Sequence, residues 1–317
     1  MSSSTAAGPL RVIMGPTAAG KSAIALTLAE RYGATIISAD SRQLYRGFDI
    51  GTAKPTAEEQ TRVPHLGLDI LDPTDRASSH WWGERARDWI GTLRGVGREP
   101  LVVGGTGFYV RALVTPLDPM PTLDATARAA LEPWLNRLAS NELTRWCEQL
   151  DPARAHLGAT QKRRAIETVL LSGRRLSDEF VAHNAITREN GSLWSSVRYL
   201  VVDPGAVLAQ RIADRVRMMV RAGWLDETRA LLETVAPDAP AWSASGYQVM
   251  RSAARGECSI DAAIERVTIE TRQYAKRQRT WCRHQIPVGE VTWLDGTAAD
   301  AMARAIAWWD TDTEEGR

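Results

Sequence analysis

The stretch Gly15-Pro-Thr-Ala-Ala-Gly-Lys-Ser22 decides the fold class of this chain of 317 residues. It matches the pattern GxxxxGK(S/T), follows the apolar run Leu10-Arg-Val-Ile-Met14, and precedes a helical pattern over residues 22–31. In such a loop the glycines let backbone N–H groups turn inward around phosphate oxygens, and the N-terminus of the next helix adds a favourable dipole potential. This context disfavours the alternative, a coincidental glycine-rich turn. The sequence therefore predicts a P-loop that binds a polyphosphate.

Two side chains of the P-loop have a specific chemical role. Lys21 supplies a positive charge for phosphate oxygens, and the Ser22 hydroxyl can ligate Mg²⁺, the one cofactor that we expect. The loop alone does not identify the reaction, because ATP-binding and other nucleotide-binding kinases, GTPases, motors and transferases all carry one. Proteins that read guanine usually contain an N-K-x-D segment, and this chain has none.

Short apolar runs and helical patterns alternate along the chain. Runs typical of buried strands cover residues 34–38, 101–103 and 199–202. Residues 205–223 predict an amphipathic helix, and another helix is predicted at about residues 261–283. The apolar face of the first of these helices consists of Leu208, Ile212, Val216 and Met219.

This alternation predicts an α/β fold, namely a P-loop NTPase-like parallel sheet flanked by helices. Residues 119–196 are different, because they are rich in helix-forming residues and contain no convincing strand. We therefore expect a catalytic core of residues 1–118 and 197–317, with an all-helical insertion domain over residues 119–196.

Composition excludes several classes of protein. With 44% hydrophobic and 24% charged residues, the chain is typical of a globular protein and not of a disordered one. No apolar run approaches the roughly 18–20 residues that span a bilayer, so no membrane partner is expected. Residues 1–9 lack the basic and apolar regions of a signal peptide and predict an unstructured leader. Three scattered cysteines and five histidines without metal-ligand spacing argue against disulfides and a transition-metal site, and we expect a cytoplasmic protein.

The net charge of +1 hides a segregation of charges. Residues 295–317 contain six acids and two bases, a net charge of −4, so the other 294 residues carry +5. A near-zero total by itself discourages nucleic acid as a partner, but the positions of the bases matter more than their sum. The charge therefore leaves a nucleic-acid partner open.

Two aspartates are candidates for chemistry beside the P-loop. Asp40 follows the predicted strand 34–38 at its carboxyl end, where α/β proteins bind ligands, so it is a candidate general base. Its alternative role is to cap the next turn, and the residues alone do not decide between the two. Asp203 ends another strand and could be a Walker-B-like aspartate, but its place before Pro204 favours a simple turn.

Six motifs occur together, and in the same order, in one known family of enzymes. They are GPTAAGKS (15–22), ISADSRQLYRGFDIGTAKP (37–55), VPH (63–65), VVGGTGFYVRAL (102–113), SGYQ (245–248) and TRQYAKRQRTW (271–281). Through them the chain resembles the bacterial tRNA dimethylallyltransferases from about residue 10 to 295, nearly its whole length. Several of the motifs are longer than ten residues, so the resemblance is specific.

The resemblance implies transfer of a dimethylallyl group from dimethylallyl diphosphate to N6 of adenosine 37 in the tRNA anticodon loop, giving N6-isopentenyladenosine and pyrophosphate. In this family the P-loop holds the leaving pyrophosphate with Mg²⁺ bridging. Asp40 matches the general base, Thr17 a residue near the diphosphate, and Arg211 and Arg215 the pair that clamps pyrophosphate. The catalytic candidates are Asp40, Thr17, Lys21, Arg211 and Arg215, and the diphosphate-binding candidates are Gly15, Pro16, Thr17, Ala18, Ala19, Gly20, Lys21 and Ser22.

These assignments agree with elementary chemistry. An allylic carbon that loses pyrophosphate develops positive charge, so the enzyme must stabilise the departing anion and align the nucleophile. Arg211 and Arg215 are four residues apart and can both reach one anion, although their spacing alone also fits a solvated basic face. N6 of adenine is a poor base, so a carboxylate such as Asp40 is needed to take its proton.

The resemblance also implies tRNA contacts, for which the target base must leave its stack. In the predicted helix 261–283, four basic residues at offsets 0, 4, 7 and 11 form one stripe that suits a phosphate backbone, and a salt-bridged face is the alternative. We expect the insertion domain to contact tRNA as well. By match to the family, the tRNA-facing residues are Asp40, Ser41, Arg42, Gln43, Thr106, Arg128, Thr160, Gln161, Lys162, Arg163, Arg164, Gly246, Tyr247, Gln248, Arg272, Lys276, Arg279 and Arg283.

Three positions depart from the family pattern. Leu66 replaces the second histidine of the usual Pro-His-His, Thr160-Gln161 replaces Gln-Arg, and Cys282 replaces an aromatic residue after the last tryptophan of its motif. None of them lies in the P-loop or at Asp40. They therefore bear on the fit of tRNA and not on the chemistry.

Two other functions compete with transfer to tRNA. One is a small-molecule enzyme, either a P-loop kinase or a prenyltransferase that uses free adenine nucleotide, and the other is an RNA-binding NTPase without transfer chemistry. The helical insertion and the basic stripe favour a tRNA substrate over a small one, which needs neither. The sequence leaves the oligomeric state open, with a monomer as the expectation.

Overall fold

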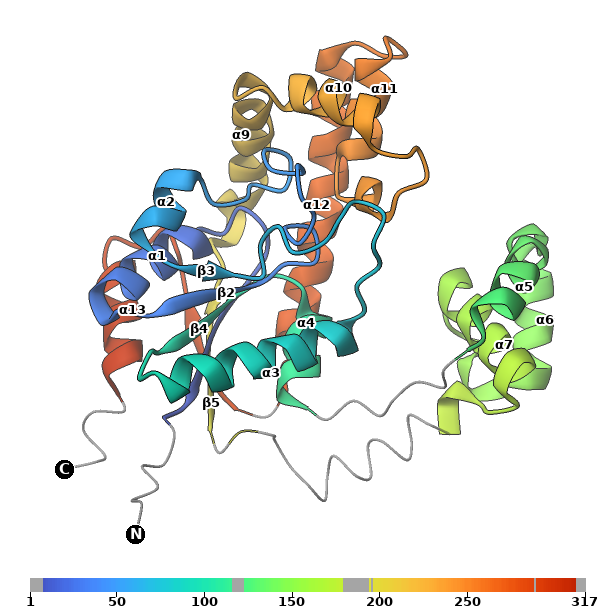
Figure 1. The fold of residues 1–317 in the computed structure, drawn as a ribbon, viewed down its shortest axis with the longest axis horizontal. Helices are drawn as coiled ribbons and strands as arrows, with labels where there is room; N and C mark the ends of the chain where they lie inside the picture. The colour runs from blue at the N-terminus through green and yellow to red at the C-terminus, as the bar shows by residue number, and fades with distance from the viewer. Residues whose placement is uncertain (1–7, 116–122, 179–193, 195, 288, 312–317) are drawn as a thin grey trace. The chain divides into compact units, whose positions relative to one another are not determined.

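The computed structural model describes residues 8–115, 123–178, 194, 196–287 and 289–311. The chain divides into two compact units, one of residues 1–114 with 194–317 and the other of residues 115–193 (Figure 1). Most of the predicted leader lies outside the described residues. Among those that are described, no helix is both long enough and apolar enough to cross a bilayer.

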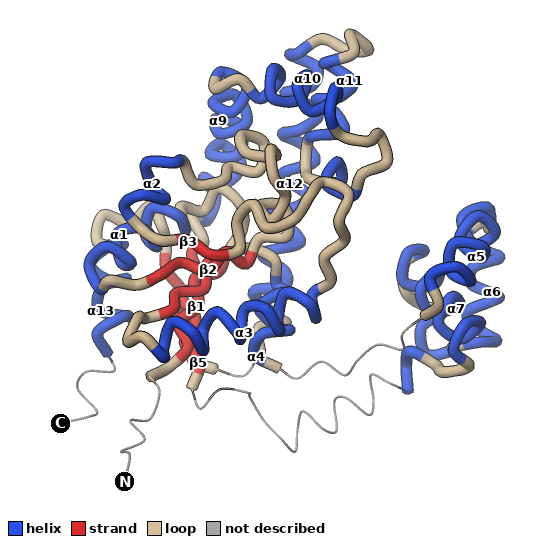
Figure 2. Tube along the Cα trace, in the orientation of Figure 1, coloured by secondary structure: helices blue, strands red, loops and turns tan. Residues whose placement is uncertain are grey.

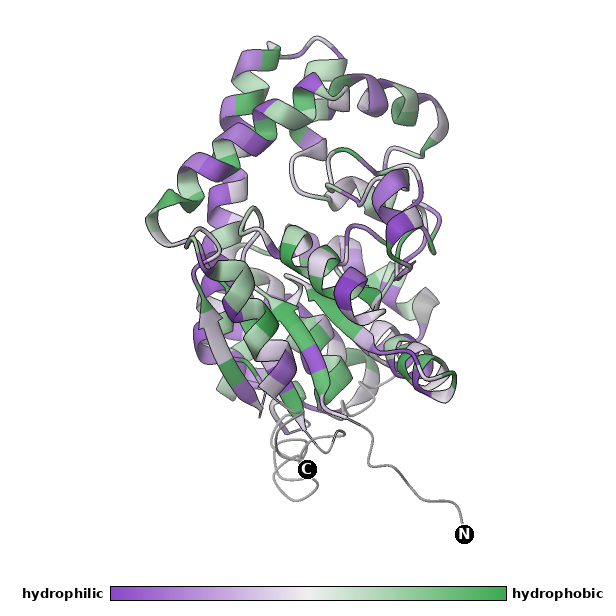
Figure 3. Ribbon diagram, turned by 90° about the vertical axis from the view of Figure 1, so that its left-hand side faces the viewer, coloured by the Kyte–Doolittle hydropathy of each residue, from purple (hydrophilic) through white to green (hydrophobic). Residues whose placement is uncertain are grey.

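The first unit is built on one parallel sheet of six strands in the order β3-β2-β4-β1-β5-β6 (Figure 2). The strands are β1 (Leu10–Met14), β2 (Thr35–Ala39), β3 (His65–Leu66), β4 (Pro100–Gly104), β5 (Val197–Val202) and β6 (Glu290–Leu294). The four inner strands are buried along their whole length, and Figure 3 shows the hydrophobic character of the sheet. Such burial is typical of parallel strands that are covered on both faces. The predicted fold class is confirmed.

One face of the sheet is covered by α1 (Lys21–Tyr32) and α13 (Ala301–Asp310), which pack against each other. The rings of Tyr32 and Trp309 stack with their centroids 4.7 Å apart, and the Tyr32 hydroxyl donates to Asp310 at 2.6 Å. The N-terminus of α1 carries Lys21 and Ser22. This packing therefore supports the helix that begins at the P-loop.

The other face is covered by α3 (Ser79–Gly95) and α4 (Gly107–Val114). Trp82 of α3 stacks on Tyr109 of α4 with ring centroids 4.8 Å apart. Both side chains are buried, which assigns a packing role to one of the twelve tryptophans. A short helix, α2 (Ala57–Arg62), precedes β3.

Four more helices of this unit form a layer beside the P-loop end of the sheet (Figure 1). They are α9 (Leu208–Arg221), α10 (Trp224–Thr234), α11 (Tyr247–Ala254) and α12 (Ile260–His284). Their core contains the buried aromatic side chains of Phe48, Trp224, Trp242 and Tyr247. α9 and α12 pack side by side and confirm the two helices predicted in this part of the chain, with a short 3₁₀ turn, Gly205–Val207, before α9.

The second unit contains α5 (Ala125–Arg137), α6 (Ser140–Leu150) and α7 (Ala159–Ser172). Leu135, Leu143, Cys147 and Ile166 are buried between them and form a core of their own. No strand occurs among the described residues of this unit.

The sequence patterns missed the two edge strands of the sheet. β3 has only two residues, and in β6 only Leu294 is buried, so neither carries the continuous apolar run that marks an inner strand. The inner strands were predictable because burial on both faces makes most of their residues apolar. An edge strand lacks that constraint.

Candidate active site

Two glycines shape the P-loop. Gly15 has a φ of +142°, and a Cβ there would lie 2.1 Å from the carbonyl oxygen of Val202, so only glycine fits between β1 and β5. Gly20 adopts the left-handed conformation, with a φ of +101°, directly before α1 begins. The loop therefore turns tightly and brings the N-terminus of α1, with its favourable potential for anions, to the site.

The ammonium group of Lys21 lies inside the loop. It donates a hydrogen bond to the carbonyl oxygen of Pro16 at 2.7 Å. Burial, together with a smaller contribution from the positive charge of Arg215, lowers the pKa of Lys21 to about 8, although Asp40 and Cys282 act in the opposite direction. A diphosphate beside this group would favour its charged form, so the site is suited to an anion.

Asp40 leaves the end of β2 and has the capping role that the sequence suggested for it. Its Oδ1 accepts a hydrogen bond from the backbone N–H of Arg42 at 2.9 Å, which caps the turn and fixes the carboxylate. The same residue lines a pocket beside the P-loop. The turn therefore holds a carboxylate at the place where a general base would act.

This pocket lies between the P-loop, the loop after β2, and helices α9, α10 and α12. Its volume is about 70 Å³. Part of its lining is the apolar face that the sequence predicted for α9. The polar lining includes Thr17, Asp40, Arg42 and Arg215, and the apolar lining includes Ile212, Val216, Met219, Trp224 and Val267.

Arg211 and Arg215 both lie on the side of α9 that faces the P-loop. The Nε of Arg211 donates to the carbonyl oxygen of Ala18 at 2.9 Å. Burial lowers the pKa of Arg215, and Arg211 lowers it further, whereas the carboxylate of Asp40 raises it. The alternative of a solvated basic face is wrong for Arg215, because this side chain lines the pocket.

Asp203 takes part in a turn and an ion pair. Its Oδ1 accepts from the backbone N–H of Gly205 at 3.0 Å and from Nε of Arg279 at 3.0 Å. A second guanidinium nitrogen of Arg279 also donates to Asp203 and to the carbonyl oxygen of Gly205. The turn interpretation of Asp203 is confirmed.

Asp203 holds the guanidinium of Arg279 within the fold, so a structural role competes with its contact to tRNA, which stays a prediction. The other members of the stripe, Arg272, Lys276 and Arg283, are exposed on α12. Arg272 also donates to the carbonyl oxygen of Ala209 at 3.3 Å. The stripe is therefore basic at three positions and salt-bridged at one.

The loop after β2 brings Ser41 and Arg42 beside Thr106. The backbone N–H of Ser41 donates to the hydroxyl of Thr106 at 3.1 Å, and Arg42 donates to the hydroxyl of Ser243 at 2.6 Å. Gln43 differs, because its amide accepts from Ser38 at 2.8 Å and donates to the carbonyl oxygens of residues 52 and 53. The side chain of Gln43 therefore holds the loop together, and its contact to tRNA stays a prediction.

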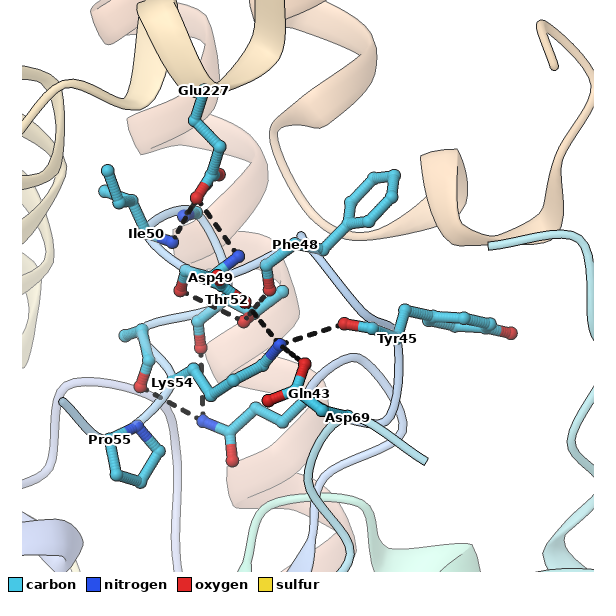
Figure 4. Close-up of polar contacts among 12 residues, drawn as sticks. Gln43, Tyr45, Phe48, Asp49, Ile50, Thr52, Lys54, Pro55, Asp69 and Glu227 are labelled. Atoms are coloured by element: carbon cyan, nitrogen blue, oxygen red, sulfur yellow. Dashed lines mark hydrogen bonds and ion pairs between the residues drawn. The ribbon is translucent and has the colours of Figure 1, made fainter. Parts of the chain in front are cut away.

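A carboxylate organises the next part of this loop (Figure 4). Glu227 of α10 accepts hydrogen bonds from the backbone N–H groups of Asp49, Ile50 and Gly51 at 3.1, 2.7 and 3.5 Å. The ammonium of Lys54 is almost fully buried and donates to the carbonyl oxygen of Tyr45 at 2.9 Å, and it also pairs with Asp49 and Asp69. The motif over residues 37–55 is thus partly a folding motif.

The prediction of a tRNA contact at Tyr247 is also wrong. Its side chain is fully buried, and its hydroxyl donates to Glu227 at 2.5 Å while it accepts from the N–H of Gly51 at 3.2 Å. Gly246, with a φ of +85°, caps the start of α11, and Gln248 is exposed. Of this predicted group, Gln248 alone presents an accessible side chain.

In the second unit the predicted basic segment divides between surface and core. Thr160, Gln161 and Arg164 are exposed. Lys162 is buried and donates to the hydroxyl of Thr144 at 2.6 Å, so its prediction as a tRNA contact is wrong. The reason is helical geometry, because consecutive residues point in directions about 100° apart and some must face inward.

The other two basic residues predicted in this unit each make a contact within it and stay partly accessible. Arg163 donates through Nε to the carbonyl oxygen of Leu135 at 3.1 Å. Arg128 pairs with Glu167 at 2.7 Å but keeps more than half of its side chain exposed.

Sequence reasoning missed Tyr274 and Gln278 of α12. Tyr274 lines the pocket with Asp40, and Gln278 accepts a hydrogen bond from the backbone N–H of Thr17 at 2.8 Å. The two are four residues apart within TRQYAKRQRTW, on the side of the helix away from the exposed bases. That spacing was the available signal.

Comparisons with known proteins agree with this geometry. The model of the IPP transferase family matches residues 43–285, and that of the isopentenyl transferases matches residues 8–69. The tRNA dimethylallyltransferase of Halorhodospira halophila is 42% identical over 87% of this chain and 90% of its own. The crystal structure of a tRNA isopentenylpyrophosphate transferase from Bacillus halodurans is 33% identical, covers 96% of this chain and 95% of its own, and has a TM-score of 0.67.

A eukaryotic dimethylallyltransferase acting on tRNA has the same fold, with a TM-score of 0.78 over 97% of this chain and 80% of its own at 24% identity. The family model covers most of the chain, and the curated relative is similar along nearly its full length. The chain with this P-loop, Asp40 and paired arginines is a member of the IPP transferase family, among the tRNA dimethylallyltransferases.

Proposed function

We propose that this protein transfers the dimethylallyl group of dimethylallyl diphosphate to N6 of adenosine 37 in the tRNA anticodon loop. The observation that carries the proposal is that the P-loop residue Thr17, the carboxylate of Asp40 and the guanidinium of Arg215 line one pocket together with apolar side chains of α9, α10 and α12. A diphosphate ester with a hydrocarbon tail needs that combination. We place the reaction in the cytoplasm, where tRNA is used.

The diphosphate end of the substrate is held by the P-loop. Its backbone N–H groups, the ammonium of Lys21 and the guanidinium groups of Arg211 and Arg215 surround the place of an anion. As the bond from the allylic carbon to oxygen breaks, negative charge collects on the departing pyrophosphate. These fixed positive groups stabilise it without reorganising.

Mg²⁺ belongs to the proposal as the cofactor. The hydroxyl of Ser22 would hold it together with diphosphate oxygens, since Ser22 is exposed in the first turn of α1 next to Lys21. When bound, the ion supplies further positive charge for the leaving group.

The hydrocarbon end lies against the apolar walls. Ile212, Val216 and Met219 follow one face of α9, and Trp224 and Val267 approach from α10 and α12. A dimethylallyl group is a small hydrocarbon that these side chains can contact. Burial of this group also keeps water away from the allylic carbon. Water that reached this carbon would attack it and hydrolyse the dimethylallyl diphosphate.

Asp40 acts on the acceptor. Its turn holds the carboxylate in place, and a proton leaves N6 for this carboxylate as the new C–N bond forms. Arg215 also lines the pocket, so the groups that serve the acceptor and the leaving group lie in the same pocket.

The accessible predicted residues are our candidates for binding tRNA. In the first unit these are Ser41, Arg42, Thr106, Gln248, Arg272, Lys276 and Arg283. In the second unit they are Arg128, Thr160, Gln161, Arg163 and Arg164. Both groups offer positive charge that RNA phosphates can use.

Labelled dimethylallyl diphosphate tests the proposal against its competitors. The purified protein is incubated with tRNA, or with AMP, in the presence of Mg²⁺, and the label in each acceptor is counted. We expect label in tRNA at adenosine 37. Label in AMP alone would indicate an enzyme of free nucleotides, and ATP hydrolysis without label transfer would indicate an NTPase.

A further inference from the structure

One side-chain amide links two loops of the active site. The Oε1 of Gln278 accepts a hydrogen bond from the backbone N–H of Thr17 at 2.8 Å, and its Nε2 donates to the carbonyl oxygen of Gly105 at 3.0 Å. Thr17 lies in the P-loop after β1, and Gly105 follows β4, the neighbouring strand. Gln278 therefore fixes the separation of the two loops.

The space around this amide is tight. Gln278 is only 7% exposed. A Cβ at Gly105 would lie 2.2 Å from Nε2 of Gln278 and 3.2 Å from the carbonyl oxygen of Gly15. The amide is therefore packed directly on backbone, and both of its hydrogen bonds are partly buried.

The same helix also holds the loop that carries Asp40. Tyr274, one turn before Gln278, lies beside Thr106. The hydroxyl of Thr106 in turn accepts from the backbone N–H of Ser41 at 3.1 Å. α12 thus contacts the loops that follow β1, β2 and β4, which are adjacent strands of the sheet.

The opposite side of this part of α12 is exposed and basic, with Arg272, Lys276 and Arg283. These residues belong to the proposed tRNA surface. A rigid helix that is held by RNA on one side and by the P-loop on the other has the geometry needed to couple the two ligands.

We propose that Gln278 is a positioning residue that sets the P-loop for diphosphate and transmits tRNA docking on α12 to it. By holding the N–H of Thr17, Gln278 fixes the orientation of the loop from which Lys21 and the remaining N–H groups reach the anion. A shift of α12 on RNA binding moves the amide and, with it, Thr17 and Gly105. The inference rests on the proposed function for the identity of both ligands.

The test compares Gln278→Met with Thr268→Val. Methionine keeps the length of the side chain and removes both hydrogen bonds. Thr268 is buried in the same helix, and its hydroxyl donates to the carbonyl oxygen of Ile264 within that helix, so its variant controls for general damage. Isothermal titration calorimetry measures the binding of inorganic pyrophosphate in Mg²⁺ buffer, with and without an anticodon stem-loop RNA, and the Tm of each variant is recorded.

We expect Gln278→Met to weaken pyrophosphate binding about tenfold, to leave RNA affinity within about twofold, and to abolish the effect of RNA on pyrophosphate affinity. In transfer assays KM for dimethylallyl diphosphate should rise about tenfold while kcat changes less than about threefold. Thr268→Val should match the wild type in all these values.

Wild-type pyrophosphate affinity in a folded Gln278→Met protein would overturn the positioning role. So would parallel losses of Tm, RNA affinity and pyrophosphate affinity, which indicate damage to the fold. If RNA leaves pyrophosphate affinity unchanged in the wild type, transmission is refuted. Failure of the wild type to transfer label to tRNA would instead refute the proposed function, because the pyrophosphate comparison does not depend on transfer.

Discussion

The guanidinium of Arg279 in α12 is paired with the carboxylate of Asp203 at the end of β5. Each residue had a functional interpretation by itself, one as a contact to RNA and the other as a Walker-B-like aspartate. In the fold the two side chains form a hydrogen-bonded ion pair with each other, and this pair is largely shielded from solvent. The pair joins the helix of the RNA surface to the central sheet.

Arg279→Ala should therefore reduce stability more than RNA binding. We expect a loss of about 1–3 kcal/mol in the free energy of unfolding, because a carboxylate with little exposure loses its partner. The salt dependence of tRNA affinity should stay unchanged. Lys276→Ala is the contrast, since its exposed ammonium should contribute about one unit to the salt slope. Equal flattening of the slope by both variants would restore Arg279 as an RNA contact.

Arg215→Ala should lower kcat about a hundredfold, because this guanidinium lines the pocket and stabilises the leaving pyrophosphate. Arg217→Ala, on the same helix, is the matched control, since Arg217 is exposed and paired with Asp214. Steady-state transfer assays with tRNA measure both variants. The role of Arg215 fails if the two variants have similar kcat values.

Asp40→Ala should abolish transfer and leave tRNA affinity within about tenfold, as expected for a base that acts in the transition state. Asp40→Asn serves as the second variant, because an amide oxygen can still accept the hydrogen bond from Arg42 and keep the turn. We expect no transfer from it either. Wild-type turnover in Asp40→Asn would remove the carboxylate from catalysis.

The affinity for pyrophosphate should fall as the pH rises through about 8. The pKa of Lys21 is lowered to about 8, so its charge is present below that pH and is lost above it. A bound anion favours the charged form, and linkage requires that affinity decline where the free protein has lost the proton. Lys21→Arg provides the control, since a guanidinium remains charged over the whole range. Titration calorimetry between pH 6.5 and about pH 9.5 should show the decline in the wild type beyond any change in the variant.

Gly51→Ala should disturb both the fold and the pocket. A Cβ at this position would lie 2.1 Å from the Trp224 ring and 2.6 Å from that of Tyr247, and neither ring has space to move. We expect a lower Tm and a higher KM for dimethylallyl diphosphate, because Trp224 lines the pocket. Gly91→Ala lies in an exposed part of α3 with nothing near its Cβ, and it should leave both values unchanged or raise the Tm.

The P-loop and the inner strands could be predicted because their signals are local. A glycine-rich stretch between an apolar run and a helix is recognised from the local sequence alone. Burial on both faces makes β1, β2, β4 and β5 predominantly apolar. The two arginines of α9 were found from the resemblance, and their helical spacing was consistent with one shared anion. Asp40 stayed ambiguous because capping and catalysis favour the same residue at the same place.

The contact partners of polar side chains could not be predicted from local sequence in the same way. Arg279 pairs with a residue 76 positions away, and Lys162 points into a helical core that its basic neighbours avoid. The motif that contains Tyr247 predicted a contact to RNA, but the hydroxyl of Tyr247 donates a hydrogen bond to the Glu227 carboxylate instead. Each of these outcomes depends on which elements pack together, and a motif does not contain that information.

Glu227 has a consequence for the kinetics of substrate capture. Its carboxylate accepts hydrogen bonds from the backbone N–H groups of residues 49–51. This edge of the pocket is therefore already ordered before any ligand binds. Because these residues are already ordered in the folded protein, substrate binding does not have to bear the entropic cost of ordering them. Dimethylallyl diphosphate should meet a preformed wall there, and the speed of its capture should follow encounter frequency instead of the rearrangement of this loop.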